Sequence, residues 1–373
     1  MATRGSIPKM MELAGIEMLP PDAGIPWIRR ELTAGGARGE VVVARALGVL
    51  MNEWDPAGGL DPLAAAAPGP MVGRLAGMGI HGPLTVETQL DPAVQPFLHD
   101  HQIEGTPVLP GVMGVEAFAE AALAVFPGWR IDAVEDVSFQ SPFKFYRREP
   151  RAVRVEAVFH PEGEDAVAVC RLMGSRTLAN QEAPQITTHF TGRVRLTRRP
   201  LEPAAGLPPR AGGPSVTAED IYRVYFHGPA YRVLARAWID GSRIVGEMAA
   251  NLPGNHHPPE QPLALEPRLL ELCFQTVGLW ELSMQSRMGL PHHAARVSPG
   301  RRLDLIEGTL YAVVTPHPED QSFDADVVDA AGNRYLQLSG YRTVALAEGV
   351  NAEPLIGLRR QGGEDKELSA TAD

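Results

Sequence analysis

The feature that most constrains the fold is a pattern that occurs twice after Pro83. Each copy combines one long helix with an apolar face and several segments in which apolar and polar residues alternate as in strands. The long helices are predicted at residues 112–125 and about 266–286. Because a helix and a sheet each bury one apolar face, the two copies predict an α+β fold of two antiparallel sheets, each wrapped on its own helix and packed side by side.

Shorter elements complete the two copies, which we place at residues 84–200 and 216–347. The first copy has predicted strands at residues 84–90, 133–139, 153–159, 166–172 and 189–196. The second copy starts with a helix at residues 218–225 and then has strands at residues 233–239, 243–248, 309–314, 322–328 and 334–344. Asp240-Gly241 predicts a tight hairpin turn. Residues 201–215 are rich in Pro, Gly and Ala and are expected to link the copies.

The segments outside the two copies look different. Residues 1–50 predict two helices and then a short apolar strand at residues 40–44, of the kind buried in a parallel sheet. These elements cannot bury their own faces, so we expect the end of a larger domain. Residues 51–83 are predicted to be a linker, and residues 348–373 a mobile tail. Gly77 to Gly82 matches the dinucleotide fingerprint, but no strand is expected before it, so we predict no nucleotide site.

Charge and cysteine content exclude several classes of function. Lys and Arg number 34 and Asp and Glu number 45, a net charge of −11, which argues against a nucleic-acid binder or a binder of anionic membranes. No apolar run is long enough to span a membrane, and no secretory signal is recognisable. Cys170 and Cys273 lack the spacing of a disulfide framework or a zinc site, so a reduced, cytoplasmic setting is expected. The histidines lack matched metal-ligand spacing as well, and no metal is predicted.

A histidine followed by a helix start gives the first functional prediction. His101 precedes Pro110 and Gly111, which stand where a loop turns into the helix predicted at residues 112–125. The free backbone N–H groups of a helix's first turn can stabilise a developing negative charge, and a histidine nearby can act as a base. Met113 is expected to belong first to the core of this helix and second to the lining of a substrate channel.

A carboxyl group on the second long helix gives the partner. Glu271 and Gln275 are four residues apart and therefore lie on one face of that helix. The residues around them are apolar, so Glu271 is expected to be desolvated, with a raised pKa that keeps it protonated. We therefore predict that Glu271 can supply a proton.

Two loop motifs resemble those of polyketide-synthase dehydratases. His101, Gly105 and Pro110 match the family motif H-x-x-x-G-x-x-x-x-P, and residues 227–231, His-Gly-Pro-Ala-Tyr, are similar to its Tyr-Gly-Pro-x-Phe motif. The family's usual Tyr is His227 here. We expect this His to be mainly a loop residue that sets the backbone shape beside Gly228, with a supporting role at the site.

Glu271 and Gln275 are similar to the family's third motif, in which an Asp is followed four residues on by Gln or His. The resemblance covers about residues 83–346. It implies a double-hotdog fold and a dehydratase domain of a type I polyketide or polyunsaturated fatty-acid synthase. Residues 1–48 resemble the C-terminal end of a ketoreductase domain of such synthases, without the part that binds NADPH.

The resemblance implies that water is eliminated from a 3-hydroxyacyl chain carried on the phosphopantetheine of an acyl carrier protein, with no other cofactor. Neutral His101 would take the α-proton, protonated Glu271 would give a proton to the departing hydroxyl, and the Gly111 N–H would stabilise the thioester oxygen. Gln275 would orient Glu271 or the leaving water. Substrate contacts are expected from Gly105, Pro110, Met113 and Tyr231. The expected partners are the carrier protein, sister domains of the synthase and a second copy of the chain.

Two alternatives remain open, because Glu271 is one methylene longer than the family's Asp. One is a non-catalytic double-hotdog module that holds the chain, and the other is a cyclase or double-bond isomerase that uses His101 as base. Two groups of arginines, at residues 147–154 and 193–199, are expected to lie mainly on solvated strand faces, with docking of an acidic carrier protein as the other possibility.

Overall fold

A computed structural model describes residues 6–17, 19–34, 42–48, 69–78, 83–126, 128–176, 183–200, 204–210, 212, 215–301, 308–345 and 352–358. The chain divides into two compact units. The smaller unit is Met1–Asp61 with Ala76–Leu84, and the larger is Pro62–Leu75 with Thr85–Asp373. Every predicted site residue lies in the larger unit.

The smaller unit contains the two helices that the sequence predicts, α1 (Ile7–Leu13) and α2 (Pro21–Ala34). Its strands differ from the prediction. Residues 42–44 are not in a strand, and residues 40 and 41 lie outside the described part. A two-residue strand β2 (Ala46–Leu47) pairs antiparallel with β1 (Ile16–Glu17) instead. Several apolar side chains of the helices are exposed, namely Ile7, Met10, Leu13, Ile25 and Ile28.

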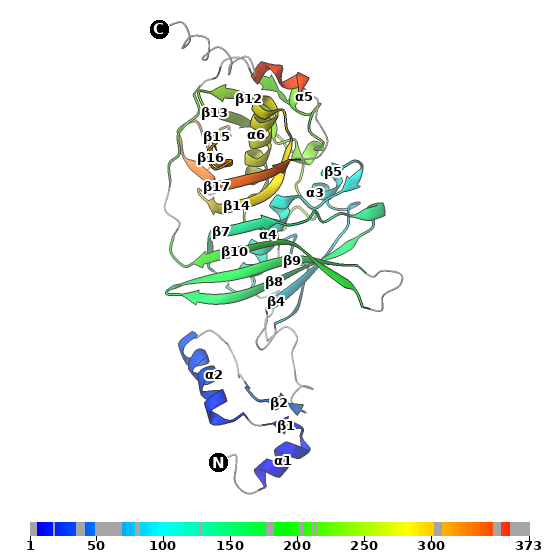
Figure 1. Ribbon diagram of the computed structural model, residues 1–373, viewed down its shortest axis with the longest axis vertical. Helices are drawn as coiled ribbons and strands as arrows, with labels where there is room; N and C mark the ends of the chain where they lie inside the picture. The colour runs from blue at the N-terminus through cyan, green and yellow to red at the C-terminus, as the bar shows by residue number, and fades with distance from the viewer. Residues whose placement is uncertain are drawn as a thin grey trace. The chain divides into compact units, whose positions relative to one another are not determined.

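Two long helices organise the larger unit (Figure 1). Helix α4 (Gly111–Leu123) packs against strands of the first copy, and α6 (Pro267–Gln285) against strands of the second. Their apolar residues are almost all buried, which is the expected source of most of their stability. The two helices also contact each other. Because each helix carries motif residues, this contact brings the two halves of the predicted site together.

One sheet of 13 strands runs through both copies, where two separate sheets were predicted. The junction is the antiparallel pairing of β7 (Arg130–Phe139) with β14 (Gly289–Pro299), for example Ala294 opposite Val137. Strand β14 was not predicted, because its sequence, GLPHHAARVSP, has neither regular alternation nor high β-propensity. The strand order is β11-β12-β13-β15-β16-β17-β14-β7-β10-β9-β8-β4-β3 (Figure 1).

The remaining strands of the sheet agree in position with the predictions where those were made. In the first copy they are β3 (Arg74–Met78), β4 (Leu84–Leu90), β8 (Arg151–Glu162), β9 (Asp165–Arg176) and β10 (Gln185–Thr197). In the second they are β11 (Val216–Thr217), β12 (Leu234–Asp240), β13 (Arg243–Met248), β15 (Tyr311–His317), β16 (Ser322–Val328) and β17 (Arg334–Ala345). The short elements are α3 (Pro96–His99), β5 (Gln102–Ile103), β6 (Thr106–Pro107), η2 (Tyr146–Arg148), α5 (Ala218–Ile221), η3 (Pro229–Tyr231) and η5 (Glu353–Leu355).

Three details correct the sequence-based expectations. Helix α5 ends at Ile221, four residues earlier than predicted. Strand β3 includes Gly77, although no strand was expected before the glycine-rich fingerprint, whose residues 79–82 lie outside the described part. Within the predicted mobile tail, η5 buries Leu355, and Leu358 is buried as well. Apolar side chains therefore hold this part of the tail in place.

A buried carboxyl group on α4 links the two copies. Both oxygens of Glu116 accept backbone hydrogen bonds, from Ala264 N at 2.5 Å and from Leu265 N at 2.9 Å, just before α6 begins. One turn later, Glu120 accepts a hydrogen bond from Met71 N at 2.8 Å. Burial raises the pKa of Glu116 to about 8, so this side chain is mostly neutral at neutral pH. These bonds fix where α6 starts relative to α4.

Candidate active site

His101 stands between a short helix and a hairpin. Helix α3 ends at His99, and the hairpin of β5 and β6 turns at Glu104-Gly105, where φ is 50° and 75°. Glycine suits the second of these left-handed positions, which explains the Gly of the motif. Gly105 therefore shapes the turn, and a contact between this residue and substrate stays a prediction. On its other side, the His101 backbone forms an isolated antiparallel bridge with His227.

Hydrogen bonding sets the tautomer of His101. Its Nδ1 lies 2.8 Å from the carbonyl oxygen of Val108, which can only accept, so Nδ1 must donate. Nε2 is then left with a lone pair. Burial, followed by the positive charge of His227, lowers the pKa of His101 to about 4. A neutral imidazole with a free Nε2 is the form that a general base requires.

Glu271 lies in the second turn of α6, where only 5% of its surface is exposed. Its Oε1 accepts a hydrogen bond from Gln275 Nε2 at 2.8 Å, as the four-residue spacing predicted. The same Oε1 lies 3.1 Å from Nε2 of His227. Gln275 is itself fixed, because its Nε2 also donates to the Tyr231 carbonyl and its Oε1 accepts from the Tyr222 hydroxyl. The carboxyl group is thus held in one orientation.

The pKa of Glu271 differs in direction from the sequence-based expectation. Burial raises this pKa, as predicted. The hydrogen bond and charge of His227, the charge of His101 and the hydrogen bond from Gln275 lower it, and the net pKa lies below that of an ordinary glutamate. The prediction that Glu271 holds its own proton through desolvation is therefore wrong, because it took no account of the imidazole beside it.

His227 joins the two halves of the site. Its ring centroid lies 5.4 Å from that of His101, and its Nε2 contacts Glu271. The ring stacks on Phe226 at 4.4 Å and is buried. His227 was expected to act mainly through the backbone of its loop, but its imidazole is the side chain that adjoins both the predicted base and the predicted acid. Sequence alone gave no distance between these residues.

Asp100 ties the His101 loop to the His227 loop, and sequence reasoning missed it. Its Oδ2 accepts a hydrogen bond from Ala230 N at 2.7 Å, and its backbone carbonyl accepts one from Gly228 N at 2.7 Å. A Cβ on residue 228 would lie 2.6 Å from Asp100 Oδ1, so only glycine fits there. The adjacency of Asp100 to His101 was the one available signal.

Helix α4 begins at Gly111, with Pro110 as the preceding cap residue, as predicted. A Cβ on residue 111 would lie 2.8 Å from the Phe139 ring, so glycine allows the helix start to approach β7 closely. Met113 is fully buried in α4, and its sulfur lies 3.6 Å from Nδ2 of Asn255. The predicted oxyanion role of Gly111 and the substrate contacts of Pro110 and Met113 stay predictions.

Two tyrosines support the site. Tyr231 is fully buried, its ring centroid lies 6.3 Å from that of His101, and its hydroxyl has no hydrogen-bond partner among the described residues. Tyr222, which was not predicted, accepts a hydrogen bond from Leu234 N at 2.9 Å and donates to Gln275 Oε1 at 2.9 Å. Two tyrosines just before the His227 motif, at 222 and 225, were the only sequence signal for this support.

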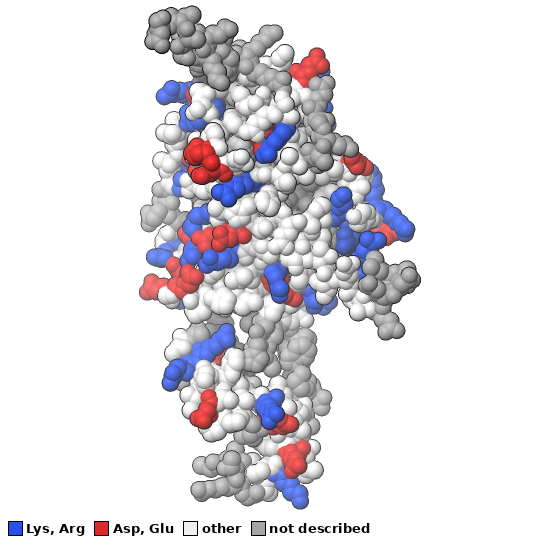
Figure 2. Space-filling model, viewed as in Figure 1, with Lys and Arg blue, Asp and Glu red and all other residues white. Residues whose placement is uncertain are grey.

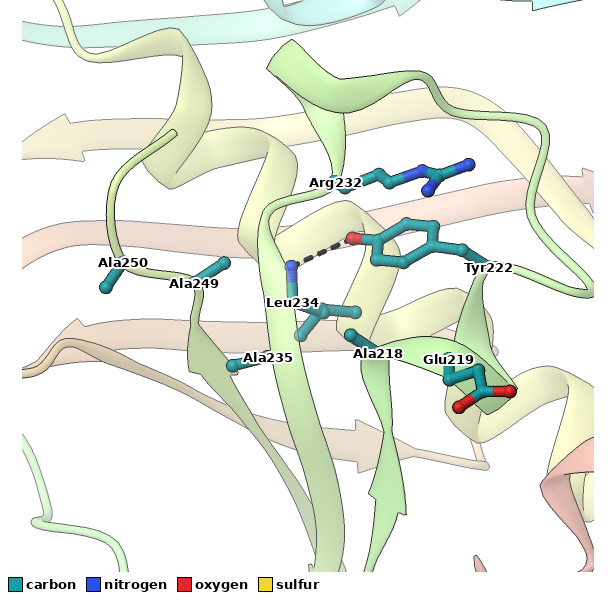
Figure 3. Close-up of a pocket in the computed structure, with 8 residues that line it drawn as sticks. All are labelled: Ala218, Glu219, Tyr222, Arg232, Leu234, Ala235, Ala249 and Ala250. Carbon is teal, nitrogen blue, oxygen red and sulfur yellow. Dashed lines mark hydrogen bonds between the residues drawn. The ribbon is translucent and has the colours of Figure 1, made fainter. Parts of the chain in front are cut away.

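An open cavity of about 610 Å³ lies beside this network (Figure 3). Tyr222 and Arg232 line it together with Leu234 and several alanines, and Figure 3 shows the Tyr222 hydroxyl directed at Leu234 N. A second cavity, of about 190 Å³, is lined by residues such as Trp280 and Phe323. Neither of these two cavities is lined by His101 or Glu271, so the predicted apolar channel between them stays a prediction.

Metal and membrane sites were searched within the described ranges. These ranges contain no group of three or more His, Cys, Asp or Glu side chains placed to hold a metal ion. None of the helices found there is long and apolar enough to cross a bilayer.

Two family models match this chain. The model of the polyketide synthase dehydratase domain matches residues 70–171, which include His101. The model described as the polyketide synthase dehydratase N-terminal domain matches residues 202–353, which include His227, Glu271 and Gln275. Together they span both copies of the repeated pattern.

Curated relatives are large synthases. The chain is 29% identical over 188 residues to spectinabilin polyketide synthase system protein NorA′ of Streptomyces orinoci, which covers 49% of this chain and 5% of that protein. It is 27% identical over 237 residues to polyketide synthase GfsB of Streptomyces halstedii, covering 61% and 4%. It is 24% identical over 223 residues to a polyunsaturated fatty acid synthase chain of a Thraustochytrium species, covering 57% and 8%. The chain thus spans less than a tenth of each.

Solved structures confirm the predicted fold class. The dehydratase domain from the CurF module of curacin polyketide synthase superposes with a TM-score of 0.62 at 18% identity, covering 74% of this chain and 99% of that domain. A trans-AT polyketide synthase dehydratase domain from Brevibacillus brevis gives a TM-score of 0.61 at 17% identity, covering 75% and 99%. The fold is therefore the α+β double hotdog.

Proposed function

Because the chain belongs to the polyketide synthase dehydratase family, we propose that it removes water from a 3-hydroxyacyl thioester to give the α,β-unsaturated thioester. The observation that carries the proposal is that the imidazole of His101 and the carboxyl group of Glu271 adjoin the same side chain, His227. These residues are far apart in the sequence and come from two motifs. Elimination of water needs a base and an acid on one small substrate, and this arrangement supplies both.

His101 is the base in this proposal. The hydrogen bond from its Nδ1 to Val108 O leaves the Nε2 lone pair free to take the α-proton. The electrons of the broken C–H bond form the new double bond, and the bond from the β-carbon to the hydroxyl oxygen breaks. The departing oxygen takes a proton through Glu271 and leaves as water. Gln275 keeps the carboxyl group aimed at this oxygen.

The start of α4 is the proposed site for the thioester oxygen. Removing the α-proton places negative charge on this oxygen, and the free N–H groups of a helix's first turn stabilise such a charge. In the described structure, the backbone N–H groups of Met113 and Gly114 bond to Pro110 O, whereas no protein partner is found for that of Gly111. We therefore assign the Gly111 N–H to the thioester oxygen.

We further propose that an acyl carrier protein delivers the substrate, and a basic cluster supports this. The cluster consists of Lys144, Arg147, Arg148, Arg151 and Arg176, near the hairpin that follows His101. Arg148 Nη2 donates to Gln102 Oε1 at 2.9 Å, and none of the five forms an ion pair within the described ranges. Figure 2 shows basic side chains gathered on the side of the molecule where β5 lies in Figure 1.

The other group of arginines is accounted for by neighbouring acids. Arg193, Arg195 and Arg199 pair with carboxylates on adjacent strands, and Arg154 pairs with Glu87. On a chain with a net charge of −11, the unpaired basic cluster is a suitable contact for an acidic carrier protein. We also propose sister domains of a synthase and a second copy of the chain as partners. The free thiols of Cys170 and Cys273 fit a cytoplasmic location.

The experiment that tests the function is incubation with a 3-hydroxyacyl chain on an acyl carrier protein or on a pantetheine mimic. Loss of one water is followed by mass spectrometry, and the new conjugated double bond by absorbance. Conversion by the wild type is expected, with none detectable in His101→Ala or Glu271→Gln. Glu266→Gln is the matched control, because Glu266 precedes the same helix and its pKa is raised to about 7 by burial. It should retain activity.

Two outcomes would contradict the proposal. Intact hydroxyacyl substrate after incubation with wild type at several chain lengths would favour the chain-holding module. A cyclised or double-bond-shifted product without prior loss of water would favour the cyclase or isomerase, which would still depend on His101.

A further inference from the structure

His227 stands where the family motif has Tyr, and its surroundings suggest more than a structural role. The ring is 6% exposed and stacks on Phe226, with its edge toward Tyr225. Its Nε2 contacts Glu271 Oε1 at 3.1 Å, whereas its Nδ1 is buried without a partner among the described residues. The contact with Glu271 is therefore the only hydrogen bond that can fix where this imidazole carries its proton.

The charged and titratable groups that face His227 come from three segments. His101 is neutral at physiological pH, because burial lowers its pKa to about 4. Burial raises the pKa of Tyr222, Tyr225 and Tyr231, so these hydroxyls are neutral as well. Arg232 donates through Nε to the His227 carbonyl oxygen and is a cation. Among the described residues, Glu271 is then the one acidic group in contact with the imidazole.

The two oxygens of Glu271 differ in their contacts. Oε1 meets both Gln275 Nε2 and His227 Nε2, whereas no hydrogen bond to Oε2 is found among the described residues. A carboxylate that accepts two N–H bonds is stabilised in its charged form, in agreement with the lowered pKa of Glu271. If Glu271 rests as a carboxylate, the proton needed for the leaving hydroxyl must be held elsewhere, within reach of it.

We propose that His227 and Glu271 hold one proton between them, so that His227 is the store from which Glu271 draws the proton given to the leaving hydroxyl. This inference rests on the proposed dehydratase function. The Nε2–H bond of the imidazolium breaks, the proton passes to the carboxylate, and the carboxyl group protonates the departing oxygen. His227 ends neutral, Glu271 ends as a carboxylate, and His101 ends as an imidazolium with the α-proton.

The same geometry restores the starting state. The His101 and His227 rings are 5.4 Å apart, and the released water can relay the α-proton from His101 Nε2 back to the pair. No external proton is then required in a cycle. His227 acts through Glu271 and is a positioning residue in this scheme, since the proton reaches the substrate from the carboxyl group. The pair titrates as a unit, so its behaviour with pH belongs to both groups.

The first test needs no substrate. The full chain is labelled with 15N-histidine, and NMR of the imidazole nitrogens is recorded near neutral pH for the wild type and for Glu271→Gln. His227→Gln assigns the His227 signals among the 11 histidines. Two protonated nitrogens are expected for His227 in the wild type and one in Glu271→Gln, because the amide does not balance the charge. A wild-type His227 with a single protonated nitrogen overturns the proposal.

The second test is the pH dependence of kcat/KM in His227→Gln. The amide keeps an N–H donor for Glu271 but cannot store a proton. The ratio of wild-type to variant kcat/KM is therefore expected to rise about tenfold per pH unit as the variant's carboxyl group ionises, until the wild type reaches its own limb. A ratio that stays constant between about pH 5 and 8 indicates a merely structural role and overturns the proposal.

His189→Gln is the matched control, because His189 is also buried but bonds to Ser141 and lies on β10. Its ratio to the wild type should not change with pH. Failure of the proposed function is distinguishable from failure of this inference. A wild type that is inactive on every hydroxyacyl substrate contradicts the function, whereas the NMR comparison still decides whether His227 and Glu271 share the proton.

Discussion

Tyr222→Phe is the substitution that best separates support of the site from support of the fold. The Tyr222 hydroxyl accepts from Leu234 N and donates to Gln275 Oε1, both at 2.9 Å. Removing it breaks two hydrogen bonds, each with a net value of about 1 kcal/mol, and leaves a buried amide oxygen unpaired. The free energy of unfolding should fall by about 2 to 3 kcal/mol.

The effect on activity comes through Gln275. Without the hydroxyl, the amide of Gln275 is free to turn, and its hydrogen bond to Glu271 Oε1 is weakened. A catalytic group that loses its orientation costs on the order of tenfold in rate. We therefore expect kcat to fall about tenfold with a smaller change in KM, because substrate binding does not use Tyr222 in this mechanism.

Tyr225→Phe is the control for this prediction. The Tyr225 hydroxyl is also buried and donates to Gln275, but to its backbone carbonyl, at 2.7 Å. Its loss should lower the free energy of unfolding by about 1 kcal/mol and leave kcat nearly unchanged. Urea unfolding and steady-state kinetics are measured on both variants. Equal falls in kcat for the two, or an unchanged kcat in Tyr222→Phe, would refute the reasoning that Gln275 orients Glu271.

Three further predictions follow from charges and burial. Because burial lowers the pKa of His101 to about 4, kcat/KM should hold as pH falls below the ordinary histidine value of 6.5 and decline only near pH 4, and a limb near 6.5 would contradict this. Burial raises the pKa of Glu116 from 4.5 to about 8, so folded Glu116 keeps a proton that the unfolded chain has lost, and stability falls as pH rises between these values. Glu116→Gln should therefore gain stability relative to the wild type between pH 5 and pH 8 in urea unfolding, whereas an equal difference at both pH values would contradict it. Arg147→Glu with Arg148→Glu should raise KM about tenfold for a carrier-bound substrate at low salt and leave KM for a pantetheine substrate unchanged, and equal effects on both would argue against docking there.

Much of the site was predictable because its signals are local. The helix start at Pro110-Gly111, the turn at Gly105 and the four-residue spacing of Glu271 and Gln275 depend on neighbours in the sequence, and the structure has all three. The long helices and most strands follow from the same local periodicity. Strand β14 escaped prediction because its residues pair well without alternating, and its pairing with β7 turns two predicted sheets into one.

The properties that sequence could not give are distances between segments far apart in the chain. The pKa of Glu271 was predicted from its apolar neighbours on α6, but its direction is set by His227, which lies 44 residues earlier in the sequence and 3.1 Å away in space. Leu355 and Leu358 were assigned to a mobile tail because the segment is polar on average, although each is fully buried.

By itself, the sequence determined the residue types available for chemistry and the local conformations that present them, because helix starts, turns and i to i+4 spacing are short-range properties. Only the tertiary structure decided which of these groups share a proton. That depends on charge and desolvation over a few ångströms, and in this protein the contact between α4 and α6 and the loop held by Asp100 bring His101, His227 and Glu271 within that range.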